Sequence, residues 1–145
     1  MEFDMHAMTA IQRRSGPTDS GRREHRQRLR ISVDRISSCT VITVHGEVDA
    51  ANAGDVSKYV VDQLAGCCQL LFDLGELDFF GIEGISALHK INAECADRGI
   101  PWLLVAAGRV SRVLRICDPE GVLPTAGSAP AGLTALDKSR HLRLL

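Results

Sequence analysis

The chain has 145 residues, of which 45% are hydrophobic and 24% charged. This size and composition predict one soluble domain with a single core rather than two independent domains. Residues 1–30 hold seven arginines against four acidic residues, so the remainder, with 10 basic and 14 acidic residues, is mildly acidic. Such a body, with only one Trp, one Tyr and four Phe, lacks the basic surface and the stacking side chains that direct nucleic-acid binding requires.

No targeting segment is visible at the start of the sequence. Residues 1–8 have neither the basic start nor the apolar stretch of a secretory signal. The densest apolar run, residues 102–107, is far shorter than the ~20 residues that span a bilayer. We therefore expect a cytoplasmic protein with no membrane association, and we interpret the polar, Arg-rich residues 1–28 as a disordered tail.

The first regular pattern begins at Leu29. Residues 29–34 alternate between apolar and polar, which is the period of two of a half-buried strand. A second strand is predicted at residues 39–45, and the short link at residues 36–38 favours an antiparallel hairpin. We expect Gly46 to end the pairing.

A helix is predicted next. Asn52 is placed to cap its first N–H groups, Asp55 favours the positive end of the helix dipole, and the apolar stripe runs to about Leu64. Residues 70–74 then form a nearly continuous apolar run, which is typical of a central parallel strand covered on both faces.

The second half of the chain continues to alternate between helix and strand. Apolar residues recur at helical spacing at Ile82, Ile85, Leu88, Ile91 and Cys95. Residues 98–101 end that helix, residues 102–106 predict another buried strand, and residues 111–117 predict another short helix. An edge strand at residues 122–125 and a last helical turn at residues 131–136 are expected beyond them.

The order of the predicted elements, ββαβαβα with a further strand and helix allowed at the end, indicates an α/β fold. Its βαβ crossovers imply a mixed sheet of four to five strands with helices packed against it. We place this domain at residues 29–137 and expect a flexible C-terminal tail at residues 138–145.

Tests for chemistry give no catalytic residues, no metal site and no cofactor. The sequence has no Gly-x-Ser-x-Gly elbow and no phosphate-binding glycine loop, and its five histidines are scattered. The five cysteines contain no Cys-x-x-Cys pair, so we interpret most of them as small core residues. A redox-responsive set that includes Cys95 and Cys117 is the alternative.

Two motifs carry the functional information. Residues 44–52 read Val-His-Gly-Glu-Val-Asp-Ala-Ala-Asn, and residues 72–85 read Phe-Asp-Leu-Gly-Glu-Leu-Asp-Phe-Phe-Gly-Ile-Glu-Gly-Ile. They resemble the Gly-Glu-Leu-Asp strand end and the Asp-Leu-Ser-x-Leu-x-Phe-x-Asp-Ser-Ser-Gly-Leu loop of the STAS domain family, and residues 111–116 resemble its third helix. Anti-sigma factor antagonists are the best-known single-domain members of that family.

The resemblance implies a changed phosphorylation site. In the family, a partner that is both kinase and anti-sigma factor phosphorylates the first Ser of this loop, and the added charge breaks the complex. The alignment places the preceding Asp on Gly81, that Ser on Ile82, the second hydroxyl residue on Glu83 and the following Gly on Gly84. Gly81 remains able to act as the helix N-cap. A permanently competent antagonist is the preferred interpretation; phosphate mimicry by Glu83 and a substitute acceptor at Ser86 are the alternatives.

The resemblance therefore implies a non-enzymatic anti-sigma factor antagonist that acts as a monomer or weak homodimer. Its partner would be an ATPase- or kinase-like anti-sigma factor, whose capture frees a sigma factor. The expected contacts are Asp49, Asn52, Asp78, Phe80, Gly81, Ile82, Glu83, Gly84 and Ser86. Two rival functions stay open: a STAS regulator in a stress-signalling or transporter-associated assembly, and a redox or nucleotide sensor.

Overall fold

The computed structural model describes residues 2–3 and 29–144. Its elements in chain order are β1 (Glu2–Phe3), β2 (Arg30–Ile36), β3 (Cys39–Val48), α3 (Ala53–Asp62), β4 (Gln69–Asp73), β5 (Leu77–Phe80), α4 (Glu83–Arg98), β6 (Trp102–Val105), α5 (Gly108–Cys117), β7 (Thr125–Ala126) and α6 (Ala129–Leu144). The tail expected at residues 1–28 lies outside the described residues except for β1, which pairs antiparallel with β2.

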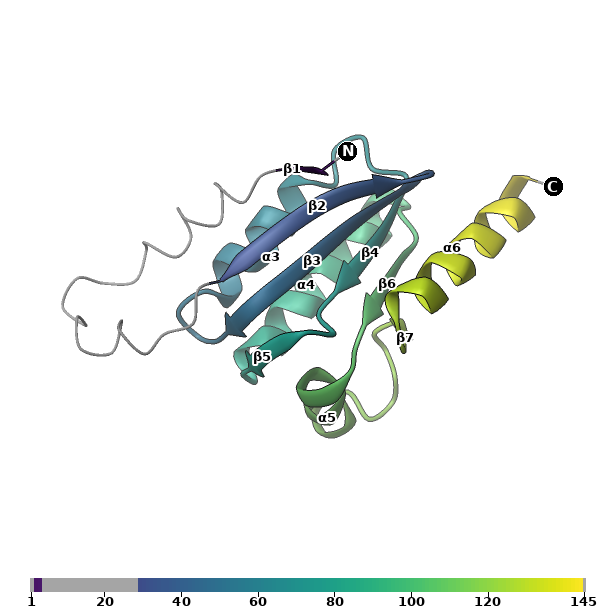
Figure 1. Cartoon of the computed structure of the whole chain (residues 1–145). Coiled ribbons are helices and arrows are strands. Elements are labelled where there is room, and N and C mark those ends of the chain that lie inside the picture. Colours follow the sequence, from purple (N-terminus) through teal and green to yellow (C-terminus); the bar gives the residue numbers. More distant parts are fainter. Residues whose placement is uncertain (1, 4–28, 145) are drawn as a thin grey trace.

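The strands form a mixed sheet, which confirms the predicted α/β fold. Their order is β1-β2-β3-β4-β6-β7, and β5 pairs with β3 (Figure 1). β2 and β3 form the predicted antiparallel hairpin, with Ser37 at its turn in a positive-φ conformation (57°). β3, β4, β6 and β7 run parallel. The sheet has more strands than the four to five expected, because the short strands β1 and β5 leave little signal in the sequence.

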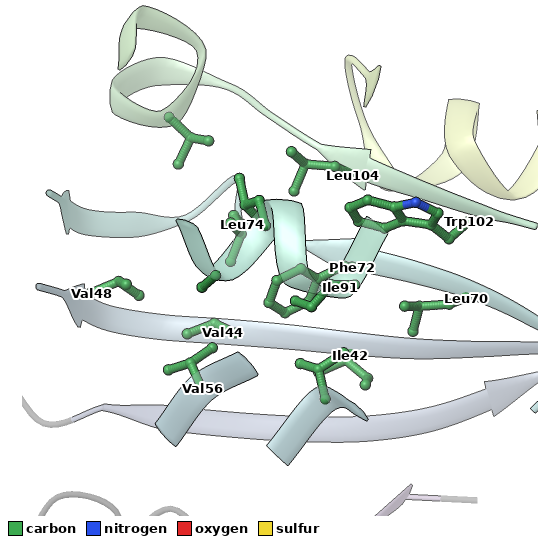
Figure 2. Close-up of a cluster of buried hydrophobic side chains, with 14 of the residues drawn as sticks. Ile42, Val44, Val48, Val56, Leu70, Phe72, Leu74, Ile91, Trp102 and Leu104 are labelled. Carbon is green, nitrogen blue, oxygen red and sulfur yellow. The ribbon is translucent and has the colours of Figure 1, made fainter. Parts of the chain in front are cut away.

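Helices cover both faces of the sheet. Ile42 and Val44 of β3 belong to the large core formed with α3 and α4, in which Phe72 of β4 and Ile91 of α4 are fully buried (Figure 2). Val41, which alternates with Ile42 and so faces the other way, packs in a smaller cluster under α6. Full burial of one such side chain contributes about 1.5–3 kcal/mol, so the large core dominates the stability of the domain.

The end of the chain differs from the sequence-based prediction. α6 is a 16-residue helix, so the single turn expected at residues 131–136 is longer, and residues 138–144, expected as a flexible tail, continue the helix. A contact between residues far apart in the sequence helps to hold it, because the buried amide nitrogen Nε2 of Gln69 donates to the carbonyl of Leu136 at 2.8 Å. No helix in the described part of the chain is long and apolar enough to cross a bilayer.

The edge strand also begins later than residues 122–125. The backbone N–H groups of Val122 and Leu123 each donate to the carboxylate of Asp118 at 3.0 Å. These bonds fold residues 118–123 into a compact turn, and pairing with β6 begins only at Thr125.

Candidate functional site

One edge of β3 pairs with two strands in succession. Its first half pairs with β4, and from Gly46 to Val48 it pairs with β5, with a register shift between Gly46 and Glu47. Gly46 has a φ of 109°, a conformation that residues with a Cβ rarely adopt. The expectation that Gly46 ends the pairing is therefore wrong, because the glycine bends β3 and allows it to change partner.

β5 occupies residues that we expected to be part of an acidic loop. In this four-residue strand Leu77 and Phe80 are buried, whereas Asp78 and Phe79 are exposed. The strand therefore buries the ring of Phe80 and leaves the ring of Phe79 facing solvent. Phe79 is 44% exposed, although the contacts expected from the sequence omit it. Phe80, which those contacts include, is only 4% exposed and packs beneath the surface.

The chain then enters α4 through Gly81 and Ile82. The backbone N–H of Gly81 donates to the carbonyl of Val48 at 2.8 Å, which extends the contact between β5 and β3. α4 begins at Glu83, and Ile82 rather than Gly81 occupies the N-cap position. Ile82 therefore precedes the buried helical stripe on which we had placed it, and its side chain is 65% exposed.

Gly84 fixes the position of the helix above β5. A Cβ at this residue would lie 2.4 Å from two ring carbons of Phe80, well inside van der Waals contact. Because Phe80 is itself buried, α4 approaches β5 this closely only while residue 84 has no side chain. Gly81 and Gly84 are both buried, so they shape the loop and offer a partner little surface.

The turn after β3 lies next to this loop, since Val48 accepts the bond from Gly81. Asn52 occupies the N-cap position of α3, but its side chain does not cap the helix. Its amide nitrogen instead donates to the carbonyl of Glu47 at 2.9 Å, and its amide oxygen accepts from the N–H of Asp49 at 3.0 Å. The predicted capping role is therefore wrong, and Asn52 ties the end of β3 to the start of α3.

The structure thus brings most of the expected contacts together. Asp78, Ile82, Glu83 and Ser86 are all exposed around the start of α4, and Glu83 lies in its first turn, where its charge is favoured by the helix dipole. Ser86 follows Ile82 by one helical turn, so the two side chains lie on the same side of the helix. The result is a small surface of apolar side chains flanked by carboxylates.

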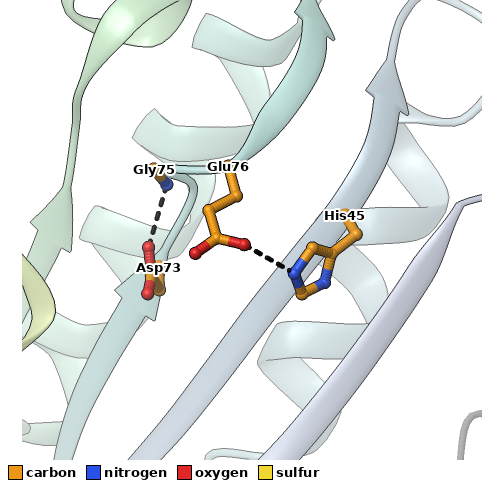
Figure 3. Close-up of polar contacts among 4 residues, drawn as sticks. All are labelled: His45, Asp73, Gly75 and Glu76. Carbon is orange, nitrogen blue, oxygen red and sulfur yellow. Dashed lines mark hydrogen bonds and ion pairs between the residues drawn. The ribbon is translucent and has the colours of Figure 1, made fainter.

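Sequence reasoning missed a polar contact at the edge of this surface. Nε2 of His45 lies 3.1 Å from Oε1 of Glu76 (Figure 3). In the same turn, the carboxylate of Asp73 accepts from the N–H of Gly75 at 2.8 Å. The side chains of His45 and Glu76 are 34% and 73% exposed, and a pair this open to water contributes about 0–1 kcal/mol. These contacts shape the turn between β4 and β5.

The cysteines differ in their exposure to solvent. All five are free thiols, and Cys95, one of the two candidates for redox chemistry, is fully buried on α4. Burial raises the pKa of Cys95 to about 12 and that of Cys39 to about 11. Since the thiolate is the reactive form, these environments disfavour redox chemistry at Cys39 and Cys95. No group of three metal-ligating side chains occurs in residues 2–3 and 29–144.

Thiol labelling tests this description. At pH 8, iodoacetamide is expected to modify exposed Cys68 quickly and to leave Cys39 and Cys95 unmodified, because pH 8 lies well below their pKa values of about 11 and about 12 and burial excludes the reagent. Peptide mass spectrometry measures the modification of each residue. Denatured protein, in which every cysteine should react, is the control. Early modification of Cys95 in the folded protein would contradict the structure.

Comparison with known protein families gives a match over most of the chain. A family model described as "STAS domain" matches residues 30–126. Among curated proteins, Osmosensory protein A of Mycobacterium tuberculosis is 36% identical over 113 residues, covering 72% of this chain and 72% of that protein. Anti-sigma-F factor antagonist RsfA of the same species is 29% identical over 111 residues, covering 74% of this chain and 87% of that protein.

Solved structures share the fold. An anti-sigma factor antagonist from Mycobacterium paratuberculosis aligns with a TM-score of 0.65 and 22% identity, over 74% of this chain and 92% of that one. The anti-sigma factor antagonist SpoIIAA in its unphosphorylated form aligns with a TM-score of 0.60 and 14% identity, over 77% of this chain and 96% of that one.

Proposed function

Because the chain belongs to the STAS domain family, we propose that it is a cytoplasmic anti-sigma factor antagonist. It binds an ATPase- or kinase-like anti-sigma factor through the loop at residues 78–84 and the exposed side of α4, and so releases a sigma factor. The observation that carries this proposal is Ile82, whose apolar side chain is 65% exposed at the start of α4.

The properties of the loop support a protein partner. Ile82 and Phe79 are large apolar side chains exposed to solvent, and such side chains gain free energy when a partner covers them. Their backbone is held by the pairing of β5 with β3 and by the bond from Gly81 to Val48. A fixed apolar surface loses little conformational entropy on binding, and the flanking carboxylates of Asp78 and Glu83 help to orient the partner.

The same loop supports a role without phosphorylation at residue 82. An isoleucine side chain has no oxygen to accept a phosphoryl group, so a kinase partner cannot add the charge that would repel it. Glu83 carries one negative charge one position later and is exposed in the first turn of α4. We favour permanent competence over mimicry, because the Ile82 side chain next to Glu83 presents an apolar surface rather than a phosphate-like one.

Direct binding tests the proposal. The full chain is titrated calorimetrically with each purified anti-sigma factor encoded in the source genome, and its monomeric or weakly dimeric state is followed by sedimentation. We expect one anti-sigma factor to bind and to lose its sigma factor as the chain is added. Failure of every anti-sigma factor to bind would refute the proposal.

Phosphorylation gives a separate prediction. With an ATPase- or kinase-like anti-sigma factor and radiolabelled ATP, the wild-type chain is expected to remain unlabelled, because residue 82 lacks a hydroxyl group. The Ile82→Ser variant is expected to acquire label at that residue. Phosphopeptide mapping locates the label, and label on Ser86 of the wild-type chain would contradict permanent competence.

A stress-signalling regulator is the second candidate, favoured by the 36% identity to Osmosensory protein A. In that case the loop at residues 78–84 would bind another component of a signalling assembly. Osmotic shock followed by crosslinking through a photoreactive group at Phe79 distinguishes the two, since the crosslinked partner is an anti-sigma factor in one case and a different signalling protein in the other.

A further inference from the structure

We propose that the outward side of α5 is a second contact surface, which binds an acidic segment of the partner protein. α5 carries Arg109, Arg112 and Arg115 and no acidic residue. All three side chains are exposed, and none forms an ion pair within residues 29–144. This inference rests on the proposed function for the identity of the partner, whereas the chemistry of the surface follows from α5 itself.

The helical spacing places the arginines together. Residues three apart are neighbours on a helix surface, so the three guanidinium groups form one row, while Val110 and Leu114 are buried on the opposite side. Ile116, one turn after Arg112, is 76% exposed. The row therefore adjoins an apolar side chain, as in protein interfaces where arginine and large apolar residues are enriched.

α5 lies beside the loop of the proposed function. It packs against β5, the strand that leads into Ile82, and both lie at the same end of the sheet (Figure 1). A partner that covers Phe79 and Ile82 is therefore close enough to contact α5 as well. The two surfaces have opposite charge, since the loop carries Asp78 and Glu83, so a partner with a basic and an acidic side fits in one orientation.

A hollow next to the row gives a carboxylate a place to bind. Its volume is about 430 Å³, and Ser111, Arg115, Asp118 and Thr125 contribute to its lining. The carboxylate of Asp118 already accepts the backbone N–H groups of residues 122 and 123 at 3.0 Å. Arg115 is the charged donor that remains available, and its planar fork suits a carboxylate in a two-point contact.

The surroundings favour an acidic protein segment over a nucleic acid or an anionic membrane. Asp78, Glu83 and Glu120 are exposed at this end of the domain, and they repel a continuous polyanion. A protein segment can place acidic side chains against the arginines and other side chains against the neighbouring carboxylates, and it can also cover Ile116. Three arginines suffice for such a local contact.

A titration that does not depend on the anti-sigma factor tests the surface. The full chain, labelled with ¹⁵N, is titrated with a soluble synthetic peptide of the repeat Glu-Glu-Leu, and separately with a DNA duplex and with phosphatidylglycerol vesicles. We expect the peptide to shift amide signals of α5 and the hollow saturably. The double variant Arg112→Glu/Arg115→Glu should abolish these shifts, whereas the matched variant Lys138→Glu/Arg143→Glu on α6 should retain them.

The outcomes separate the two proposals. Absence of shifts on α5, or tighter binding of the duplex or the vesicles than of the peptide, overturns the inference and leaves the proposed function intact. With an anti-sigma factor that the wild-type chain binds, the α5 double variant should slow association about ten-fold at low salt, as expected for charges at the rim of an interface. An equal slowing by the α6 double variant also overturns the inference.

Discussion

Replacing Ile82 with aspartate is expected to weaken binding of the anti-sigma factor by about 30- to 1,000-fold, the equivalent of the ~2–4 kcal/mol lost at an interface hot spot. The substitution removes a side chain that is 65% exposed and adds a third negative charge beside Asp78 and Glu83. Isothermal titration calorimetry with the cognate anti-sigma factor measures the change. Folding is not expected to suffer, because residue 82 is exposed at the start of α4, where the helix dipole favours a negative charge.

The chain offers a matched control for this substitution. Leu142 on α6 is 70% exposed, so Leu142→Asp makes the same chemical change at a similar exposure but far from the loop. It should leave binding unchanged. Urea denaturation of Ile82→Asp should give a free energy of unfolding similar to that of the wild type. Unchanged binding by Ile82→Asp, with normal folding, would remove Ile82 from the interface.

The second large effect is expected from Gly84→Ala, which should lower the free energy of unfolding by about 2–3 kcal/mol, in the range for an overpacked core. The new Cβ would lie 2.4 Å from the ring of Phe80, and the ring is only 4% exposed, so it has no free space to enter. α4 must then move away from β5, and binding through the loop should weaken as well. Urea denaturation measures the loss of stability.

Gly54→Ala is the control for this substitution. Gly54 and Gly84 are each the second residue of a helix, but a Cβ at Gly54 meets no atom within 4 Å. Gly54→Ala should therefore leave stability unchanged or raise it by up to ~1 kcal/mol through helix propensity. Reducing the ring by Phe80→Leu in the Gly84→Ala background should restore part of the lost stability. Equal effects of the two glycine substitutions would show that the contact with Phe80 is not the cause.

The sequence predicts the elements whose contacts are regular and periodic. The hairpin of β2 and β3, the buried strand β4 and the apolar stripe of α4 from Ile85 onward all follow from alternation or helical spacing. β5 is missed because only Leu77 and Phe80 of its four residues are buried, and their spacing does not fit an alternating pattern. Its pairing depends on Gly46, whose role appears only when the distant strand is in place.

The candidate site shows a similar limit. The motifs identify the loop, but they do not fix the residue at which α4 begins. A difference of one residue in that start decides whether Ile82 is buried or exposed. Likewise, Asn52 has a side chain that can cap a helix. Its amide bonds instead to the carbonyl of Glu47 and the N–H of Asp49, and not to the first N–H groups of α3. Such a side chain can bond to more than one backbone group, and tertiary geometry decides which one it bonds to. The sequence pattern does not show that geometry.

The double pairing of β3 has a kinetic consequence for recognition. One edge of β3 pairs first with β4 in the core and then with β5 at the site. The strand that leads into the loop is therefore hydrogen-bonded to the same strand as the centre of the sheet. We therefore expect the proposed partner to bind a loop whose main chain is already held by strand pairing, so that little affinity is lost to conformers that cannot bind. On the proposed function, we expect the rate of the response to depend on the amounts of the partner and of this chain rather than on a rearrangement of the loop.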